Sequence, residues 1–414
     1  MSLLDGSTSI DDLTYVVGET YRISPAQARS LVDSVLDKTR SFLASSTRQE
    51  LDAPRYDPKT FIFRISPEDA NDCGPLDSPL ALNIVLTKRC NFRCRYCYFD
   101  SCANTPEDLP GRKTLDLIEE GHDMGVVVIM LTGGEPLLYD GICEVVAAIT
   151  ERNMVPVIST NGSFLGSEMI EGLINAGLES IQVSLDAPCA EIHHFLTRTR
   201  NTFRTVLSGI QSLKSNGFYV RTNSVMTQNN YSHLEDLIDL LVDNNVDEIV
   251  ITIQRPGSCE SKIIDSSPEL TEREIDYVRQ KVEERMDEHD GHPRFRLNVE
   301  GEWQGQQDII RCGNLHSSLV IHPSGNATIC EMIENAPELS YGNVFESSLK
   351  EIWQGPSHQH LLDLTVDPSH IDKDCSLCEN LDFCRTGCFN LSRLSEGDFF
   401  GKDPRCPGAS EMRR

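Results

Sequence analysis

The sequence has no long apolar segment and is poor in positive charge. None of its apolar runs approaches the roughly 18 residues that a membrane helix needs, and its first residues, MSLLDGSTSIDD, are acidic, unlike those of a signal peptide. Lys and Arg number 37 against 64 Asp and Glu, a formal net charge of −27, which disfavours nucleic acid and anionic membranes as partners. These absences predict a cytoplasmic protein of the folded globular class.

The chain has 414 residues, enough for two or three domains of roughly 150 residues each. Residues 1–48 are helical in pattern, and residues 49–78, with several prolines, are expected to form a linker. Between residues 79 and 300, runs rich in Val, Ile and Leu alternate with helical segments, which is typical of a parallel sheet buried on both faces. Residues 301–414 have shorter polar connections and are expected to form a further domain, organised by metal.

Strands and helices alternate along the central region. The predicted strands are 80–87, 126–132, 155–160, 180–186, 219–226 and 248–254. The predicted helices lie near 114–123, 140–152, 166–176, 202–215, 231–244 and 271–289. This order indicates an α/β fold, a partial (β/α)6 barrel of the TIM type, with its chemistry at the carboxyl ends of the strands.

Cysteine is abundant, and the 15 cysteines are clustered. A secreted disulfide scaffold is usually short and follows a signal segment, so clustered thiols in this long chain indicate metal ligands. Cys90, Cys94 and Cys97 form a CxxxCxxC loop directly after the first predicted strand. Three thiolates can hold three irons of a cubane and leave the fourth iron open. A zinc site or structural thiols are the alternatives.

Polar segments follow the next three predicted strands: TGGEP at 132–136, STNG at 159–162 and SLD at 184–186. Each segment alone could be a turn. The glycines allow the backbone to approach a ligand, and Glu135 can accept a hydrogen bond from an amine. Together the segments lie on the same rim as the cysteine loop, which predicts a cofactor site there.

The stretch from about residue 79 to 256 resembles the radical S-adenosylmethionine (SAM) enzymes in these motifs and in the aromatic residue before the third cysteine. The resemblance implies a [4Fe-4S] cluster on Cys90, Cys94 and Cys97, with SAM on the open iron. It also implies that SAM is cleaved to methionine and a 5′-deoxyadenosyl radical, which removes a hydrogen atom from the substrate. The expected SAM contacts are Tyr96, Gly133, Gly134, Glu135, Ser159, Asn161, Ser184 and Asp186, with Arg198 or Arg200 for the carboxylate.

Seven further cysteines lie near the carboxyl end, four of them spaced CxxCxxxxxCxxxC, and over residues 311–408 they resemble the SPASM domain of radical SAM peptide maturases. The resemblance implies two auxiliary [4Fe-4S] clusters, three in all. The ligands would be Cys375, Cys378, Cys384 and Cys406 for one, and Cys312, Cys330 and Cys388 for the other. The fourth position of the latter would take the substrate, a non-cysteine residue or Cys259. A zinc ribbon over residues 375–388 is the alternative.

Residues 3–46 resemble the helical half of a PqqD-like RiPP recognition element, a small domain that captures the leader of a ribosomal precursor peptide. The strands of that family precede an LLDG turn, and the sequence starts at this turn. We therefore expect either a truncated domain or a missed upstream start. A plain helical appendage on the barrel is the alternative.

These resemblances imply a radical SAM/SPASM maturase that abstracts hydrogen from a precursor peptide and installs a carbon–carbon or thioether crosslink. A flavodoxin or ferredoxin is the implied reductant. Cys259, after the sixth predicted strand, could donate a hydrogen atom if the product were an epimer. The alternatives are the same chemistry on a sulfatase-type protein or a small molecule, and a non-catalytic iron–sulfur electron-transfer protein.

Overall fold

The chain forms two compact units, Met1–Cys73 and Gly74–Arg414. The computed structural model describes residues 10–11, 14, 29, 32, 76–97, 99, 107–253, 270–289, 294–298, 312, 314–334, 336–378, 381–404 and 406. The described residues of the first unit are helical, and Arg29 pairs with Asp11 at 3.2 Å between Nη1 and Oδ1. Most of the segment predicted to resemble a RiPP recognition element, and nearly all of the predicted linker, lie outside the described residues.

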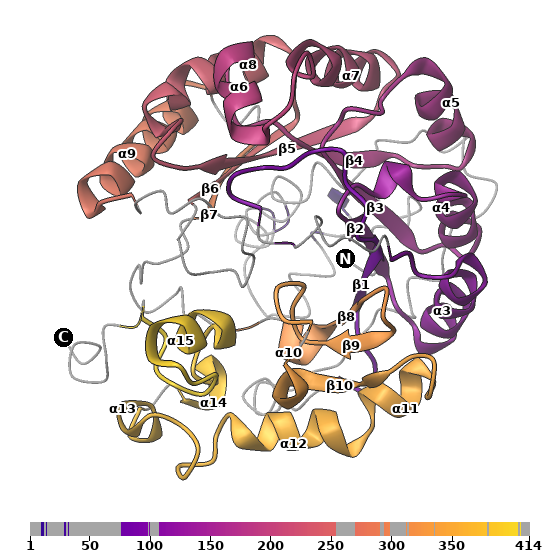
Figure 1. Ribbon diagram of the computed structural model, residues 1–414, viewed down its shortest axis with the longest axis vertical. Helices are drawn as coiled ribbons and strands as arrows, with labels where there is room; N and C mark the ends of the chain where they lie inside the picture. The colour runs from indigo at the N-terminus through magenta and orange to yellow at the C-terminus, as the bar shows by residue number, and fades with distance from the viewer. Residues whose placement is uncertain are drawn as a thin grey trace. The chain divides into compact units, whose positions relative to one another are not determined.

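A sheet forms the centre of the second unit (Figure 1). Seven of its described strands run parallel and pair in chain order. They are β1 (Ala81–Thr87), β2 (Val128–Gly133), β3 (Val155–Thr160), β4 (Ser180–Ser184), β5 (Tyr219–Met226), β6 (Glu248–Ile253) and β7 (Arg294–Asn298). Every predicted strand is present, and the prediction of an α/β partial barrel is confirmed.

Helices connect the strands and lie along the outer side of the curved sheet (Figure 1). They are α3 (Gly111–Met124), α4 (Ile142–Glu151), α5 (Ser167–Asn175), α6 (Ala190–Thr197), α7 (Phe203–Ser215), α8 (Leu234–Asp243) and α9 (Glu272–Glu288). Short 3-10 turns, η4 (Pro136–Leu138) and η5 (Tyr231–His233), precede α4 and α8. Among the helices described, none is both long and apolar enough to cross a lipid bilayer.

Two elements of the barrel are absent from the sequence prediction. The strand β7 has the sequence RFRLN and pairs with β6. It escapes prediction because only two of its five residues, Phe295 and Leu297, are apolar, too few for a clear strand pattern. The helix α6 spans only eight residues, and its buried positions are His193, Leu196 and Thr197, an i, i+3, i+4 pattern that is the available signal.

The carboxyl-terminal region extends the same sheet. The strand β8 (Ser318–Ile321) pairs in parallel with β1, and β9 (Asn326–Thr328) and β10 (Ser340–Asn343) continue from it in antiparallel order. The helices are α10 (Asn314–Ser317), α11 (Leu349–Trp353), α12 (Pro356–Leu364), α13 (Lys373–Ser376), α14 (Leu381–Cys384) and α15 (Phe389–Glu396), with the turn η7 (Pro337–Leu339). Leu319 and Ile321 belong to the same apolar core as Leu82 and Ile84 of β1, so apolar packing holds this region to the barrel.

Candidate functional site

The loop after β1 carries three half-buried cysteines, Cys90, Cys94 and Cys97, and none of them is in a disulfide. Burial raises the pKa of Cys90 to about 12, and the nearby Glu135 and Cys97 add to this shift. Burial also holds the pKa of Cys94 well above its usual range, with Cys97 and Asp186 as further causes. Thiols that repel one another when ionised fit a bound cationic centre, because coordination replaces the protons and offsets the repulsion.

The carboxyl end of α6 holds this loop. The backbone N–H of Arg93 donates to the Thr197 carbonyl at 3.1 Å, and that of Arg95 donates to the Leu196 carbonyl at 2.8 Å. The Arg95 guanidinium lies 4.1 Å from the centroid of the Phe195 ring. The last carbonyls of a helix have no partner within the helix, so the loop satisfies them and is fixed in return.

The two glycines of the GGEP segment pack against the start of the cysteine loop. The N–H of Gly134 donates to the Thr87 carbonyl at 2.8 Å. A Cβ added to Gly133 would lie 2.3 Å from the Thr87 oxygen, and one added to Gly134 would lie 2.3 Å from the Arg89 oxygen. Real Cβ atoms do not come this close to backbone, so glycine is required here for the approach of β2 to the loop.

Glu135 is completely buried and ties the end of β2 to the end of β3. Its Oε1 accepts hydrogen bonds from Thr160 Oγ1 at 2.6 Å and from the Leu137 N–H at 3.0 Å. Its Oε2 accepts one from the Asn161 N–H at 2.7 Å. Burial raises the pKa of Glu135 to about 7, against the lowering effect of these three donors. The group is therefore poised to change protonation near neutral pH.

The end of β3 also reaches the cysteine loop. Asn161 Nδ2 donates to Asn91 Oδ1 at 2.9 Å and lies 3.9 Å from the Sγ atom of Cys90. Ser159, two residues earlier, accepts a hydrogen bond from Gln182 Nε2 at 2.9 Å. The predicted contact residues of β3 thus point in two directions, Asn161 to the cysteine loop and Ser159 to β4.

Asp186, just after β4, is buried and joins the loop from another side. Its carboxylate accepts hydrogen bonds from the Tyr96 hydroxyl and from the Val225 N–H, the latter at 2.7 Å. Burial raises the pKa of Asp186 to about 6, although both bonds oppose the shift. Burial, and then the charge of Asp186, hold the pKa of Tyr96 well above its usual range. The half-buried Tyr96 and the buried Asp186 therefore form one acidic pair beside Cys94.

The remaining predicted SAM contacts lie around this centre. Ser184 is the last residue of β4 and pairs in register with Asn223 of β5. Arg198 and Arg200 are both exposed and follow α6, where Arg198 has a left-handed backbone with φ of 52°. Cys259, the predicted hydrogen donor, lies outside the described residues.

The seven carboxyl-terminal thiols interact in two groups. The charges of Cys312 and Cys388 act on Cys330, where burial is the main cause of a raised pKa. Cys406 and Cys378 act on both Cys375 and Cys384, whose pKa values burial raises to about 12. Within the described ranges, no three His, Cys, Asp or Glu side chains are close enough to bind a single metal ion.

Two polar residues border these thiols and were not predicted. Asp403 is buried, and its Oδ2 accepts a hydrogen bond from the Cys388 N–H at 2.7 Å. The hydroxyl of Tyr341 is buried and has no hydrogen-bond partner among the described residues. Burial, and then the nearby Cys312 thiol, raise the pKa of Tyr341 well above its usual range. Buried hydroxyl groups usually have a hydrogen-bond partner, so the Tyr341 hydroxyl fits a site beside Cys312 that binds a group able to accept its hydrogen bond.

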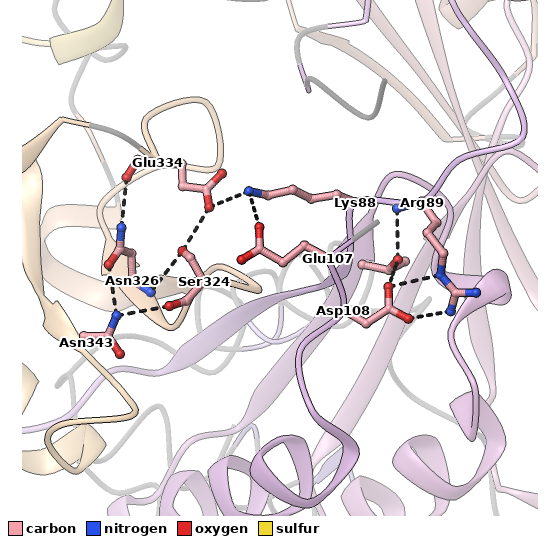
Figure 2. Close-up of polar contacts among 9 residues, drawn as sticks. Lys88, Arg89, Glu107, Asp108, Ser324, Asn326, Glu334 and Asn343 are labelled. Atoms are coloured by element: carbon pink, nitrogen blue, oxygen red, sulfur yellow. Dashed lines mark hydrogen bonds and ion pairs between the residues drawn. The ribbon is translucent and has the colours of Figure 1, made fainter. Parts of the chain in front are cut away.

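A polar network connects the cysteine loop of the barrel to the carboxyl-terminal region (Figure 2). Lys88 Nζ lies 2.8 Å from Glu334 Oε1 and 2.8 Å from Glu107 Oε2. Burial opposes the charge of Lys88, but its bonds to the two carboxylates outweigh this and raise its pKa. Beside it, Arg89 pairs with Asp108 at 2.6 Å between Nη2 and Oδ2. No local sequence pattern indicates this network, because its members lie far apart in the chain.

Comparisons with known proteins agree with this arrangement. Residues 84–254 match the family model of the radical SAM superfamily, and residues 312–380 match that of SPASM, an iron–sulfur cluster-binding domain. Mycofactocin maturase MftC of Mycolicibacterium smegmatis is 24% identical over 335 residues, which cover 80% of this chain and 83% of that protein. Fe-coproporphyrin III synthase of Methanosarcina barkeri is 24% identical over 346 residues, which cover 78% of this chain and 86% of that protein.

A solved structure shows the same fold. The crystal structure of Streptococcus suis SuiB bound to precursor peptide SuiA aligns with a TM-score of 0.66 at 16% identity. The alignment covers 91% of this chain and 88% of that chain. The barrel region thus matches the radical SAM model, and the carboxyl-terminal region matches the SPASM model.

Proposed function

We propose that this radical SAM enzyme with a SPASM domain modifies a ribosomal precursor peptide by hydrogen abstraction and installs a carbon–carbon or thioether crosslink. The observation that carries the proposal is the similarity to mycofactocin maturase, which extends over 80% of this chain. The likeness of the fold to SuiB, solved with its precursor peptide, supports it. The strong negative charge, −27, suits a peptide with basic segments.

In this proposal, Cys90, Cys94 and Cys97 hold a [4Fe-4S] cluster. Burial and mutual repulsion raise the pKa values of these thiols and so disfavour the free thiolates. A bound metal, which replaces the proton, would offset this cost and supports the role. When bound, the cluster and SAM supply a 5′-deoxyadenosyl radical that abstracts hydrogen from the substrate. The hydrogen bonds from Arg93 and Arg95 to the end of α6 hold the loop on either side of Cys94, which supports this role.

The residues at the strand ends are proposed to hold SAM. A carboxylate has roughly four acceptor sites, and Glu135 uses three of them in described bonds, which leaves one for the SAM amine. Gly133 and Gly134 bring this segment next to the cysteine loop. The other proposed contacts are Tyr96, Ser159, Asn161, Ser184 and Asp186, with Arg198 or Arg200 for the carboxylate.

The two carboxyl-terminal thiol groups are proposed to bind auxiliary [4Fe-4S] clusters. Cys375, Cys378, Cys384 and Cys406 supply four ligands for one, and Cys312, Cys330 and Cys388 supply three for the other. The electrostatic neighbours within each group support this division. A cluster near Cys312 would give the buried Tyr341 hydroxyl an acceptor. A flavodoxin- or ferredoxin-type protein would supply the electrons.

Cys94→Ala tests the catalytic part of the proposal. The protein is reconstituted without oxygen and assayed for iron and for 5′-deoxyadenosine formed from SAM and dithionite. We expect about twelve irons in the wild type and about eight in the variant, which should form no deoxyadenosine. Cys143→Ala, a half-buried cysteine on α4, is the matched control and should behave as the wild type. Wild-type protein that binds iron but never forms deoxyadenosine would favour the electron-transfer alternative.

The substrate needs a separate experiment, because one relative is an AdoMet-dependent heme synthase of Methanosarcina barkeri, 23% identical over 345 residues. That relative favours a tetrapyrrole as the second candidate substrate. Short peptides encoded beside the gene and iron-coproporphyrin are offered in parallel to the active enzyme. A mass change in a peptide, dependent on its leader, is the expected result. Turnover of the porphyrin alone would replace the peptide with the small molecule.

A further inference from the structure

Lys88 and Glu334 connect two cysteine loops at their bases. Lys88 follows β1 and precedes Cys90 by two residues, and Glu334 follows Cys330 by four. The distance between Lys88 Nζ and Glu334 Oε1 is 2.8 Å (Figure 2). Only 17% of the Lys88 side chain and 14% of the Glu334 side chain are exposed. A pair this shielded is less weakened by solvent and salt than an exposed surface pair.

Both partners are anchored on their own side. On the barrel side, the Lys88 N–H donates to the Glu107 carbonyl at 2.8 Å, and Lys88 Nζ pairs with the Glu107 carboxylate at 2.8 Å. On the other side, Glu334 Oε1 accepts a hydrogen bond from Ser324 Oγ at 2.9 Å. Asn343 Nδ2 donates in turn to the Ser324 carbonyl at 3.1 Å. Because each partner is held on its own side, the ion pair fixes the two loops relative to each other. An ion pair between mobile side chains would not.

The two carboxylates on Lys88 have different partners. Glu107 belongs to the barrel, next to the Thr87–Asp108 bridge, whereas Glu334 belongs to the segment after Cys330. Either carboxylate can balance the charge of Lys88. Of these two carboxylates, only Glu334 belongs to the carboxyl-terminal region. Loss of the Glu334 bond therefore tests the position of the loops, whereas loss of the Glu107 bond tests only the balance of charge at Lys88.

We propose that Lys88 is a positioning residue that fixes the Cys330 loop against the Cys90–Cys97 loop through Glu334. The inference rests on the proposed function for the identity of the clusters that the loops hold. It adds that this ion pair fixes the two loops against each other, beyond the placement of the two regions by the pairing of β1 with β8. Without the pair, each loop keeps its own ligands, but the loops shift more freely relative to each other.

The test compares Glu334→Gln with Glu107→Gln in the full-length, reconstituted protein. Each substitution keeps the shape and removes one negative charge beside Lys88. In hydrogen exchange, we expect Glu334→Gln to speed exchange in residues 88–97 and 330–334 together by about threefold or more. Glu107→Gln should leave residues 330–334 unchanged. Lys88→Met should reproduce the effect of Glu334→Gln, and Lys88→Arg should restore most of the protection.

A second readout separates positioning from simple loosening. In the dithionite-reduced protein, the magnetic interaction between clusters should weaken in Glu334→Gln while the iron content stays at the wild-type level. Unchanged exchange in both loops, faster exchange in only one, or an equal effect of Glu107→Gln would overturn the proposal. If the wild type forms no deoxyadenosine, the proposed function fails, but the exchange experiment still decides the role of Lys88.

Discussion

Burial shifts the pKa values of three residues near the cysteine loop, Glu135, Asp186 and His193. Glu135 and Asp186 have raised pKa values, about 7 and about 6, because burial disfavours their charged forms. His193, behind Phe92 of the loop, has a pKa lowered to about 4, mainly by burial and then by His194. The acids and the histidine are thus both kept closer to their neutral forms, which lowers the charge near the proposed cluster.

His193→Gln should reduce the loss of stability in acid. His193 is 1% exposed, and its pKa falls from 6.5 to about 4 in the fold. Below pH 6.5 the unfolded chain therefore binds a proton that the native protein does not. Between pH 7 and pH 5 this costs the wild type about 2 kcal/mol, and the cost disappears in the variant.

The measurement is the midpoint of thermal unfolding at both pH values, without oxygen. The difference between the two proteins reports His193 together with its neighbour His194, whose charge acts on it. The exposed His360→Gln is the control for the loss of a histidine outside this cluster. Equal slopes for His193→Gln and the wild type would contradict the expectation.

The end of β2 meets the cysteine loop through backbone contacts, whereas β3 and β4 reach it through the side chains of Asn161 and Asp186. The approach of β2 is the closest, since an added Cβ at Gly134 would lie 2.3 Å from the Arg89 oxygen and 2.7 Å from its carbonyl carbon. Backbone atoms cannot rotate away as a side chain can. The position of the loop on the barrel therefore depends on the absence of a side chain at this residue.

Gly134→Ala should displace the cysteine loop. We expect a destabilisation of about 3 kcal/mol and a loss of roughly four irons. The control is Gly111→Ala, at the start of α3, where an added Cβ would meet only Tyr139 Oη at 3.7 Å. That substitution should be neutral or stabilising by up to about 1 kcal/mol. Iron content and unfolding midpoint are the readouts, and wild-type values in Gly134→Ala would show that the loop can shift freely.

Sequence patterns predict the strands β1 to β6 and most of their helices because apolar residues recur in these segments with the period of a strand or a helix. They fail for α6 and β7, which are short and partly charged. They also fail for β8, although it is apolar, because its pairing with β1 joins segments far apart in the chain. For the site, motif spacing brings the cysteines and strand ends to one rim, but hydrogen bonds such as that from Tyr96 to Asp186 depend on tertiary packing.

In the second unit, one sheet and one apolar core extend from the barrel into the SPASM region, which begins at Cys312. Ala81 to Ile84 of β1 pair with Ser318 to Ile321 of β8, and all four residues of β8 are buried. Glu120 of α3 adds a further link, since its Oε2 accepts a hydrogen bond from the Leu349 N–H of α11 at 2.6 Å. These contacts make the SPASM region a structural part of the barrel, in addition to its proposed role in binding clusters.

Removing the SPASM region should therefore prevent the barrel from folding in soluble form. A fragment of residues 74–300 would leave β1 as an exposed edge strand and uncover the apolar surface that β8 buries, and such edges pair with other chains. A fragment of residues 74–414 contains the whole second unit and should stay soluble. The soluble fraction after expression and the elution volume on size exclusion measure both outcomes. A monomeric 74–300 fragment with cooperative unfolding would mean that β1 does not need its partner, and that the ten-stranded sheet consists of two independently stable parts.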